Sequence, residues 1–360
     1  MSTPSDPAPT VILGPDAVTD PSTAREVLEA AFAARGLAGE VRYTADVREF
    51  DAEIRSAAGD SVVVPGAVPL AEIIGARFVR VDLDACERLD TTGVRTHIRG
   101  RGLGGLRYAV DAWYFHRLHP AAVVSYGDHP EQVIDVRTPE GPGPHPVAVL
   151  IHGGYWKPWW DRDLMDAAAV DLTARGYATW NVEYRRPAEH GWDATTADVG
   201  AALAAVGSAP AAFDRDRVVI LGHSAGGQLA LCAGADAAVI RPILLVSLAG
   251  VLDLRTADDR WLGDGAVSAA LGHRYTPASE AYRHSSPLER VPLGIPQVVV
   301  CGEADASDLR EITRHYTSRA AEAGDRVELV EAPGDHFAVI DPDSAIWRRT
   351  IEKVTASMSR

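Results

Sequence analysis

The stretch best suited to chemistry is Gly222-His-Ser-Ala-Gly-Gly227, where a serine stands two residues from a glycine on each side. An apolar, strand-like run over residues 218–221 precedes it, and a helical pattern over residues 225–235 follows. Glycines at these positions allow a tight turn that presents the Ser224 hydroxyl at a corner as a nucleophile. The alternative interpretation is an ordinary strand-to-helix turn that needs only small residues.

A serine hydroxyl is a weak nucleophile unless a histidine, oriented by a carboxylate, takes its proton. Of the twelve histidines, His336 stands out because it follows a strand-like run over residues 327–331 and a short turn. Asp305 follows the strand-like residues 298–301, with Glu303 and Asp308 as alternative acids. We predict the triad Ser224, Asp305 and His336, since each residue follows a strand and their chain order suits this chemistry.

A glycine-rich loop, His152-Gly-Gly-Tyr-Trp156, follows the strand-like residues 147–151. Glycines leave backbone N–H groups accessible, and such groups stabilise the oxyanion that forms when a serine attacks a carbonyl carbon. The sequence therefore predicts an oxyanion hole, a set of N–H donors, whose members are Gly153, Gly154, Tyr155 and Ala225.

Several tryptophans fall in segments expected near the same edge of the sheet. Either they form an aromatic substrate pocket or they pack in the core, which is the commoner role of tryptophan. The pocket candidates are Trp156, Trp159, Trp160, Trp192 and Trp261. The irregular segment 252–287 is expected to form a small cap over the site.

The elements that must position these residues alternate between strands and helices in two series. The first predicts a small parallel-sheet domain over residues 10–117, with helical patterns at 22–35, 47–58 and 70–76. The second predicts a larger α/β domain over residues 118–360. Within it, residues 132–138 and 147–152 flank a Pro/Gly-rich turn, which favours a hairpin between them.

Bulk composition excludes several classes of function. The 360-residue chain has a formal net charge of −15, which disfavours nucleic acid as a partner. The apolar runs are strand-sized, so we expect no membrane partner, and the N-terminus lacks the features of a signal peptide. Three widely separated cysteines fit a cytoplasmic protein and argue against disulfides or a zinc site.

Residues 131–360 resemble the α/β-hydrolase superfamily in its esterase and arylformamidase-like branch. The resemblance rests on the serine corner, the glycine loop and the two turns Gly302-Glu-Ala-Asp305 and Gly334-Asp-His-Phe337. Further matches are Asn181-Val-Glu-Tyr-Arg185 and Ser247-Leu-Ala-Gly-Val251.

This resemblance implies hydrolysis of a small carboxylic ester or an aryl amide or formamide through an acyl-enzyme on Ser224. It implies that His336 is the base, that Asp305 orients it, and that neither a metal nor an organic cofactor is needed. The expected partner is a small-molecule substrate. Two alternatives stay open: acyl transfer or cyclisation by the same triad, and a non-catalytic binding protein.

The first domain contains Gly-Arg-Gly-Leu-Gly-Gly over residues 100–105, which has the spacing of a dinucleotide-binding motif. Its context argues against NAD, because no complete βαβ unit with an acid about 20 residues on follows it. Residues 11–110 are instead similar to type II 3-dehydroquinate dehydratases, which have a flavodoxin-like fold. Val68-Pro-Leu70 and Asp82-Leu-Asp-Ala85 replace pieces that carry that family's function. We therefore expect a non-catalytic domain that supports a homo-oligomer or shapes the hydrolase entrance.

Overall fold

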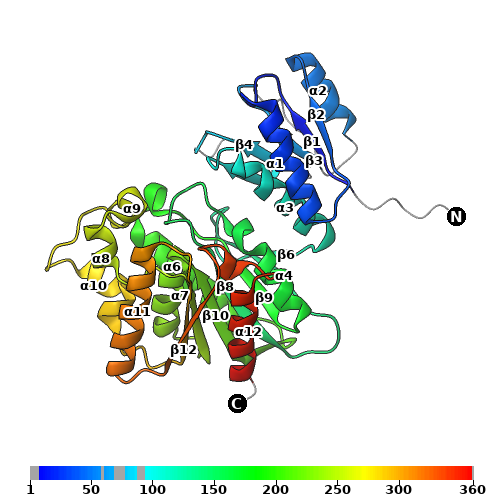
Figure 1. The fold of residues 1–360 in the computed structure, drawn as a ribbon. Coiled ribbons are helices and arrows are strands. Elements are labelled where there is room, and N and C mark those ends of the chain that lie inside the picture. The colour runs from blue at the N-terminus through cyan, green and yellow to red at the C-terminus, as the bar shows by residue number, and fades with distance from the viewer. Residues whose placement is uncertain (1–7, 58–60, 69–77, 87–93, 359–360) are drawn as a thin grey trace. The chain divides into compact units, whose positions relative to one another are not determined.

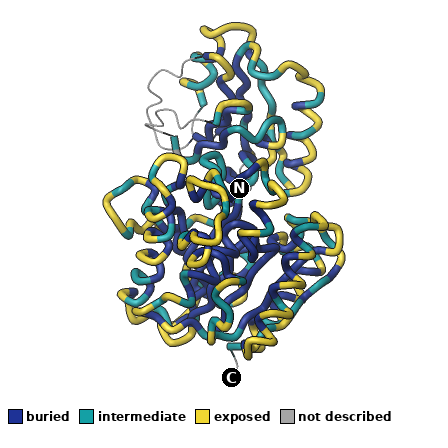
Figure 2. The backbone as a smooth tube through the Cα atoms, turned by 90° about the vertical axis from the view of Figure 1, so that its left-hand side faces the viewer, coloured by how far each residue is buried: buried dark blue, intermediate teal, exposed yellow. Residues whose placement is uncertain are grey.

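The computed structural model describes residues 8–57, 61–68, 78–86 and 94–358, and the chain divides into two compact units, 1–120 and 121–360 (Figure 1). The helical pattern expected at 70–76 lies outside the described residues, as do residues 69 and 70 of the Val68-Pro-Leu70 stretch. Figure 2 shows buried residues filling the interior of each unit.

The first unit is a parallel five-stranded sheet in the order β2-β1-β3-β4-β5. This is the flavodoxin-like strand order, so the predicted fold class of this unit is confirmed. Helices α1 and α3 pack on one face through a shared apolar core, whereas Phe50 of α2 packs against Ile12 and Val63 on the other. The elements are β1 (Thr10–Leu13), α1 (Pro21–Ala34), β2 (Glu40–Tyr43), α2 (Val47–Ser56), β3 (Ser61–Val64), β4 (Phe78–Asp82), β5 (Val94–Arg99) and α3 (Gly104–Leu118).

The second unit contains an eight-stranded sheet in the order β13-β12-β11-β10-β8-β9-β7-β6. The pairs β6·β7 and β7·β9 are antiparallel, and the other neighbours are parallel. The strands are β6 (Ala122–Ser125), β7 (Val133–Arg137), β8 (His145–Ile151), β9 (Ala178–Val182), β10 (Phe213–His223), β11 (Leu244–Leu248), β12 (Gln297–Gly302) and β13 (Val327–Ala332).

The expected hairpin between residues 132–138 and 147–152 is wrong. Strand β9 lies between β7 and β8, pairing Ile134 with Val182 on one side and Leu150 with Asn181 on the other. The hairpin partner of β7 is β6, which the sequence analysis missed. A Pro/Gly-rich turn marks where a strand ends, but it does not select the strand's partner, which depends on burial across the whole sheet.

Helices cover both faces of this sheet (Figure 1). Apolar residues of α6, α7 and α11 form one core with β8, β10 and β12. On the opposite face α4 and α12 are joined by the Trp347 indole N–H, which donates to Asp171 Oδ2 at 2.8 Å. The helices are η1 (Arg162–Met165), α4 (Asp166–Ala174), α5 (Pro187–His190), α6 (Trp192–Gly207), α7 (Ala225–Asp236), η2 (Pro287–Arg290), α11 (Ser307–Glu322), η3 (Ala338–Ile340) and α12 (Ala345–Met358).

The predicted cap segment is helical and reaches the glycine-rich loop. It contains α8 (Leu254–Asp259), α9 (Leu262–Leu271) and α10 (Glu280–Ser285). Gly263 lies so close to the Tyr155 ring that an added Cβ would stand 2.8 Å from the ring carbon Cγ. Within the described residues, no helix combines the length and apolar character that a bilayer span requires.

Candidate active site

Ser224 occupies a sharp turn between β10 and α7. Its backbone angles, φ 53° and ψ −120°, are unusual for a residue with a side chain, and such conformations occur where the surrounding fold enforces them. A Cβ on Gly222 would lie 2.0 Å from the Gly226 carbonyl oxygen, and one on Gly226 would lie 2.2 Å from that of Ile151. The two glycines are therefore required by close backbone packing. The Ser224 N–H donates to the Leu248 carbonyl at 2.8 Å, which fixes the turn to β11.

Asp305 and His336 meet at the ends of two neighbouring strands. The His336 Nδ1 nitrogen lies 3.1 Å from Asp305 Oδ1 and 3.0 Å from Oδ2. The other two acids are placed differently, since Glu303 is exposed and Asp308 forms an ion pair with Arg260 at 2.6 Å. Of the three candidate acids, Asp305 is the one whose carboxylate can hold the histidine ring.

The turns that carry these two residues pack directly on each other. The Glu303 N–H donates to the Ala332 carbonyl and the Ala304 N–H to that of Gly334, both at 2.9 Å. A Cβ on Gly302 would lie 2.2 Å from the Gly334 carbonyl oxygen, so this close approach requires glycine. The carboxyl ends of β12 and β13 thus fix the spacing between acid and histidine.

His223, the neighbour of the serine, brings the histidine turn to the serine corner. Its Nε2 lies 3.0 Å from the His336 carbonyl oxygen, and because a carbonyl only accepts, Nε2 carries the proton. The two imidazole rings lie 4.9 Å apart between centroids. Burial lowers the pKa of His223 to about 3, with a smaller contribution from His336, so this imidazole is neutral at neutral pH.

Within the part of the chain that the structure describes, Ser224 Oγ has no hydrogen-bond partner. Catalytic hydrogen bonds are often long before substrate binds and shorten in the complex, so this geometry is compatible with a serine and histidine that act together.

The glycine-rich loop lies against the serine corner. A Cβ on Gly153 would stand 2.8 Å from the Ser224 Cβ. Gly154, Tyr155 and Trp156 all have positive φ, at 108°, 52° and 56°, so three successive residues depart from extended and right-handed helical backbone. Among the described residues, the backbone N–H groups of residues 153–155 find no acceptor.

The fourth predicted donor, Ala225, is in the first turn of α7, where backbone N–H groups have no partner within the helix. Of the four predicted donors, Gly153 and Ala225 lie directly beside Ser224, and the role of all four as an oxyanion hole stays a prediction. Donors left without an intramolecular partner can be used by an anionic oxygen.

A buried network of charged and polar side chains bonds to His152, the first residue of the glycine-rich loop. No role was predicted for this network from the sequence. Glu183 Oε1 lies 3.2 Å from His152 Nε2 and accepts from Arg186 at 2.5 Å. Arg186 also donates to the Trp160 carbonyl, and the Tyr184 hydroxyl donates to that of His152 at 2.9 Å. Burial alone would raise the pKa of Glu183, but the Arg186 guanidinium and His152 lower it well below its usual value. The signal in the sequence was charged residues directly after a buried strand.

The five tryptophans fall into two groups. Trp156 and Trp192 are buried and pack edge to face with centroids 5.6 Å apart, so both belong to the core. Trp159 and Trp160 are half-buried, and Trp160 lies 6.4 Å from the Phe337 ring. Trp261 is 53% exposed in the cap. Their role as pocket walls stays a prediction.

The strand order of the second unit, the serine turn after a central strand and the acid and histidine turns on successive strands together define the α/β-hydrolase fold. The fold class predicted from the sequence is therefore confirmed for both units. A family model described as BD-FAE matches residues 134–307, a range that includes Ser224 and Asp305.

Among curated proteins, Esterase LipC of Mycobacterium tuberculosis (strain ATCC 25618 / H37Rv) is 27% identical over 243 residues. The match covers 61% of this chain and 59% of that protein, so the chain spans less than two thirds of its relative's length. The resemblance of the first unit to type II dehydroquinate dehydratases stays a prediction.

Solved structures with the same fold include a bacterial heroin esterase, with 22% identity and a TM-score of 0.55 over 66% of this chain and 83% of that one. A truncated carbohydrate esterase from gut microbiota has 19% identity and a TM-score of 0.58, covering 66% and 95% of the two chains. Esterase 2 of Thermogutta terrifontis has 20% identity and a TM-score of 0.54, covering 67% and 94%.

Proposed function

We propose that the second unit is a serine hydrolase that cleaves a small carboxylic ester through an acyl-enzyme on Ser224. The observation that carries this proposal is the strained turn at Ser224, next to which His223 bonds to the carbonyl of His336, whose ring is in turn bonded to Asp305. Backbone strain of this kind is maintained where a function needs it. The named relatives, which are esterases, favour an ester as the bond that is cleaved.

The proposed reaction has two steps. The Ser224 oxygen attacks the carbonyl carbon while His336 Nε2 takes the hydroxyl proton, and the carbonyl oxygen becomes an oxyanion facing the N–H groups of Ala225 and the glycine-rich loop. As the carbon–oxygen bond to the alcohol breaks, His336 returns the proton to the leaving group. Water, deprotonated by His336, then attacks the acyl carbon. The bond from that carbon to the Ser224 oxygen breaks, His336 returns the proton to Ser224, and the acid leaves. Asp305 holds the ring and stabilises its positive charge in both steps.

We also propose which chemical group the substrate carries on its acyl or leaving-group side. Aromatic side chains stand near His336, where Phe337 is 38% exposed and lies 5.5 Å from the histidine ring. With Trp160 beside it, this rim favours a substrate that has an aryl group, either an aryl ester or an aryl amide or formamide. An amide carries a poorer leaving group than an aryl ester, so turnover should be fastest with aryl esters.

The test combines a fluorophosphonate probe with a panel of aryl acetates, aryl butyrates and N-formyl anilides. Wild type should be labelled on Ser224 and hydrolyse the aryl esters, whereas Ser224→Ala should do neither. The control is Ser247→Ala, a buried serine one strand away. Activity retained by Ser224→Ala would remove this residue from the mechanism, and an unlabelled, inactive wild type would refute the enzyme function.

For the first unit we propose a structural role without dehydratase activity. Asp82 there is bound by Arg80 and His97, at 2.6 Å and 2.5 Å, so this carboxylate is already occupied by partners of its own unit. Dehydration of 3-dehydroquinate by the full chain would contradict this proposal.

A further inference from the structure

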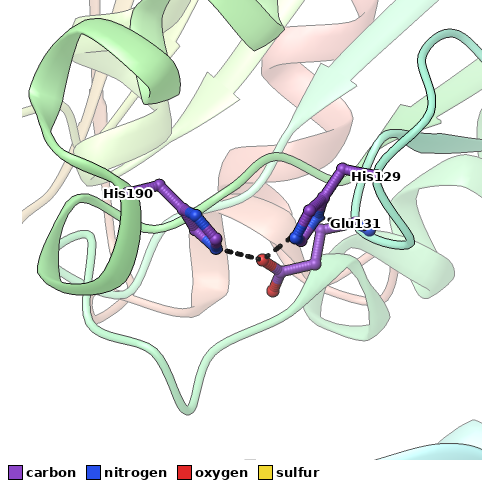
Figure 3. A group of neighbouring side chains, drawn as sticks. All are labelled: His129, Glu131 and His190. Atoms are coloured by element: carbon purple, nitrogen blue, oxygen red, sulfur yellow. Dashed lines mark hydrogen bonds and ion pairs between the residues drawn. The ribbon is translucent and has the colours of Figure 1, made fainter.

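Two histidines and a glutamate converge outside the triad (Figure 3). His190 Nε2 lies 3.6 Å and His129 Nδ1 lies 4.0 Å from the same oxygen, Glu131 Oε2. One ligand atom from each of the three residues lies within 4.8 Å of the other two. Figure 3 shows both rings directed toward the carboxylate. The cluster joins two segments that are far apart in sequence.

Sheet topology explains why these segments meet. His129 and Glu131 lie in the loop between β6 and β7, and His190 is the last residue of α5, which follows β9. Because β7 runs antiparallel to β9, with Ile134 opposite Val182, the start of β7 lies at the carboxyl end of β9. That edge also carries the serine, acid and histidine turns, since β8 to β13 are parallel to β9.

The donor set suits a divalent ion of the zinc class. Two imidazoles and one carboxylate form a known three-residue zinc ligand set, in which water takes the fourth position. Ligands of one tetrahedral zinc ion stand about 3.3 Å apart. The two histidine nitrogens stand 3.6 Å and 4.0 Å from the glutamate oxygen, and all three atoms lie within 4.8 Å of one another, so the side chains must close up around an ion. Glu131 is buried, while the two histidine side chains are 35% and 25% exposed, which leaves the cluster accessible to an entering ion.

The protonation state of His129 is also suitable. The backbone N–H of Glu131 donates to His129 Nδ1 at 3.2 Å, so this nitrogen carries a lone pair and Nε2 carries the proton. A metal ion needs such a lone pair, and it would replace one weak hydrogen bond. His190 Nε2 has a second acid nearby, Glu189 at 3.8 Å, which adds negative charge at the cluster.

We propose that His129, Glu131 and His190 bind one divalent transition-metal ion, with zinc as the representative, and that the ion ties the β6–β7 loop to α5. The triad needs no metal for its chemistry, and the role that we assign to the ion is to hold these two segments together. Arg186, which directly precedes α5, bonds to Glu183 and the Trp160 carbonyl behind the oxyanion loop. An ion that fixes α5 to the β6–β7 loop would therefore also hold Arg186 in place, and Arg186 holds the glycine-rich loop through Glu183.

The experiment uses the full chain without a histidine tag, stripped with a chelator, loaded with zinc and dialysed against metal-free buffer. Wild type should retain one zinc ion per chain, and the double variant His129→Ala/His190→Ala should retain none. The matched control His284→Ala/His315→Ala removes two exposed histidines elsewhere in the unit and should retain the ion. Equal retention by the two double variants, or none by wild type, would overturn the proposal.

Cobalt substitution identifies the ligands independently. The visible spectrum of bound Co²⁺ should show nitrogen and oxygen ligation, and a thiolate charge-transfer band would assign the ion to a cysteine instead. Zinc should raise the thermal midpoint of wild type and of the control variant, but not that of the first double variant. If that variant does not fold, Glu131→Gln, which keeps the side-chain volume, replaces it and should also lose the ion. Ser224→Ala should retain zinc, so this proposal and the proposed hydrolase function fail separately.

Discussion

Acidification should destabilise the second unit through His223. This imidazole is buried, donates to the His336 carbonyl and has its pKa lowered to about 3 by burial. In the unfolded chain the same group titrates near its ordinary value of about 6.5. Below that pH the unfolded state binds a proton that the folded state does not bind until about pH 3. The contribution is therefore fully present above pH 6.5 and is lost as the pH falls.

The magnitude follows from proton linkage. Between about pH 7 and about pH 5, protonation of the unfolded imidazole lowers the free energy of unfolding by about 2 kcal/mol. The variant His223→Gln keeps an N–H donor for the His336 carbonyl but does not titrate. Whatever its stability at neutral pH, it should lose about 2 kcal/mol less than wild type over this range, because the other titrating groups are the same in both proteins.

Urea unfolding followed by tryptophan fluorescence is the appropriate assay. Seven of the eight tryptophans lie in residues 121–360, so the signal reports mainly on the second unit. The measured quantity is the change in unfolding free energy from pH 7 to pH 5 in each protein. Equal changes in wild type and His223→Gln would show that the folded imidazole is solvated or already charged, and the electrostatic argument would be refuted.

Three substitutions test the rest of the site. Asp305→Asn should lower kcat by about 10⁴-fold, since an amide cannot hold the imidazole in the required tautomer, whereas the neighbouring Glu303→Gln should keep near-normal steady-state kinetics. Gly226→Ala would place a Cβ 2.2 Å from a backbone carbonyl oxygen, so it should lower the unfolding free energy, measured by chemical denaturation, by about 2 to 3 kcal/mol. The control Gly200→Ala adds its Cβ to open space beside α6 and should not lower that free energy. Glu183→Gln leaves the buried Arg186 guanidinium with only Asp161, at 3.3 Å, as a carboxylate partner. The variant should therefore have an unfolding free energy lower by about 3 kcal/mol and should lower kcat more than it changes KM. Wild-type stability and kcat in the Glu183→Gln variant would mean that the ionic network does not position the glycine-rich loop.

Much of the fold was predictable because its signals are local. The helix expected at 225–235 matches α7 (Ala225–Asp236), and the strand-like residues 218–221 fall within β10. Strand pairing was predicted less well. The sequence shows that residues 133–137 form a strand, but the position of β7 between β6 and β9 depends on contacts made across the whole sheet.

The residues of the site could be predicted from short motifs because the backbone conformation at each motif allows only certain residue types. Glycines at 222 and 226 are needed for a turn that brings carbonyl groups within contact distance, and glycine at 302 is needed for the acid turn to pack on the histidine turn. Such requirements are local in sequence, so the sequence by itself determined which serine, which glycine loop and which histidine to examine.

Only the tertiary structure decided between candidate residues that the local sequence pattern does not distinguish. Asp305 differs from Glu303 and Asp308 because its carboxylate alone among the three stands against the His336 ring, a consequence of how β12 and β13 end side by side. The links between Glu183 and His152, and between Glu131 and His190, likewise join residues far apart in the chain. Electrostatic contacts depend on the distance between two groups in space. For residues far apart in the chain, that distance is set by how the strands pair.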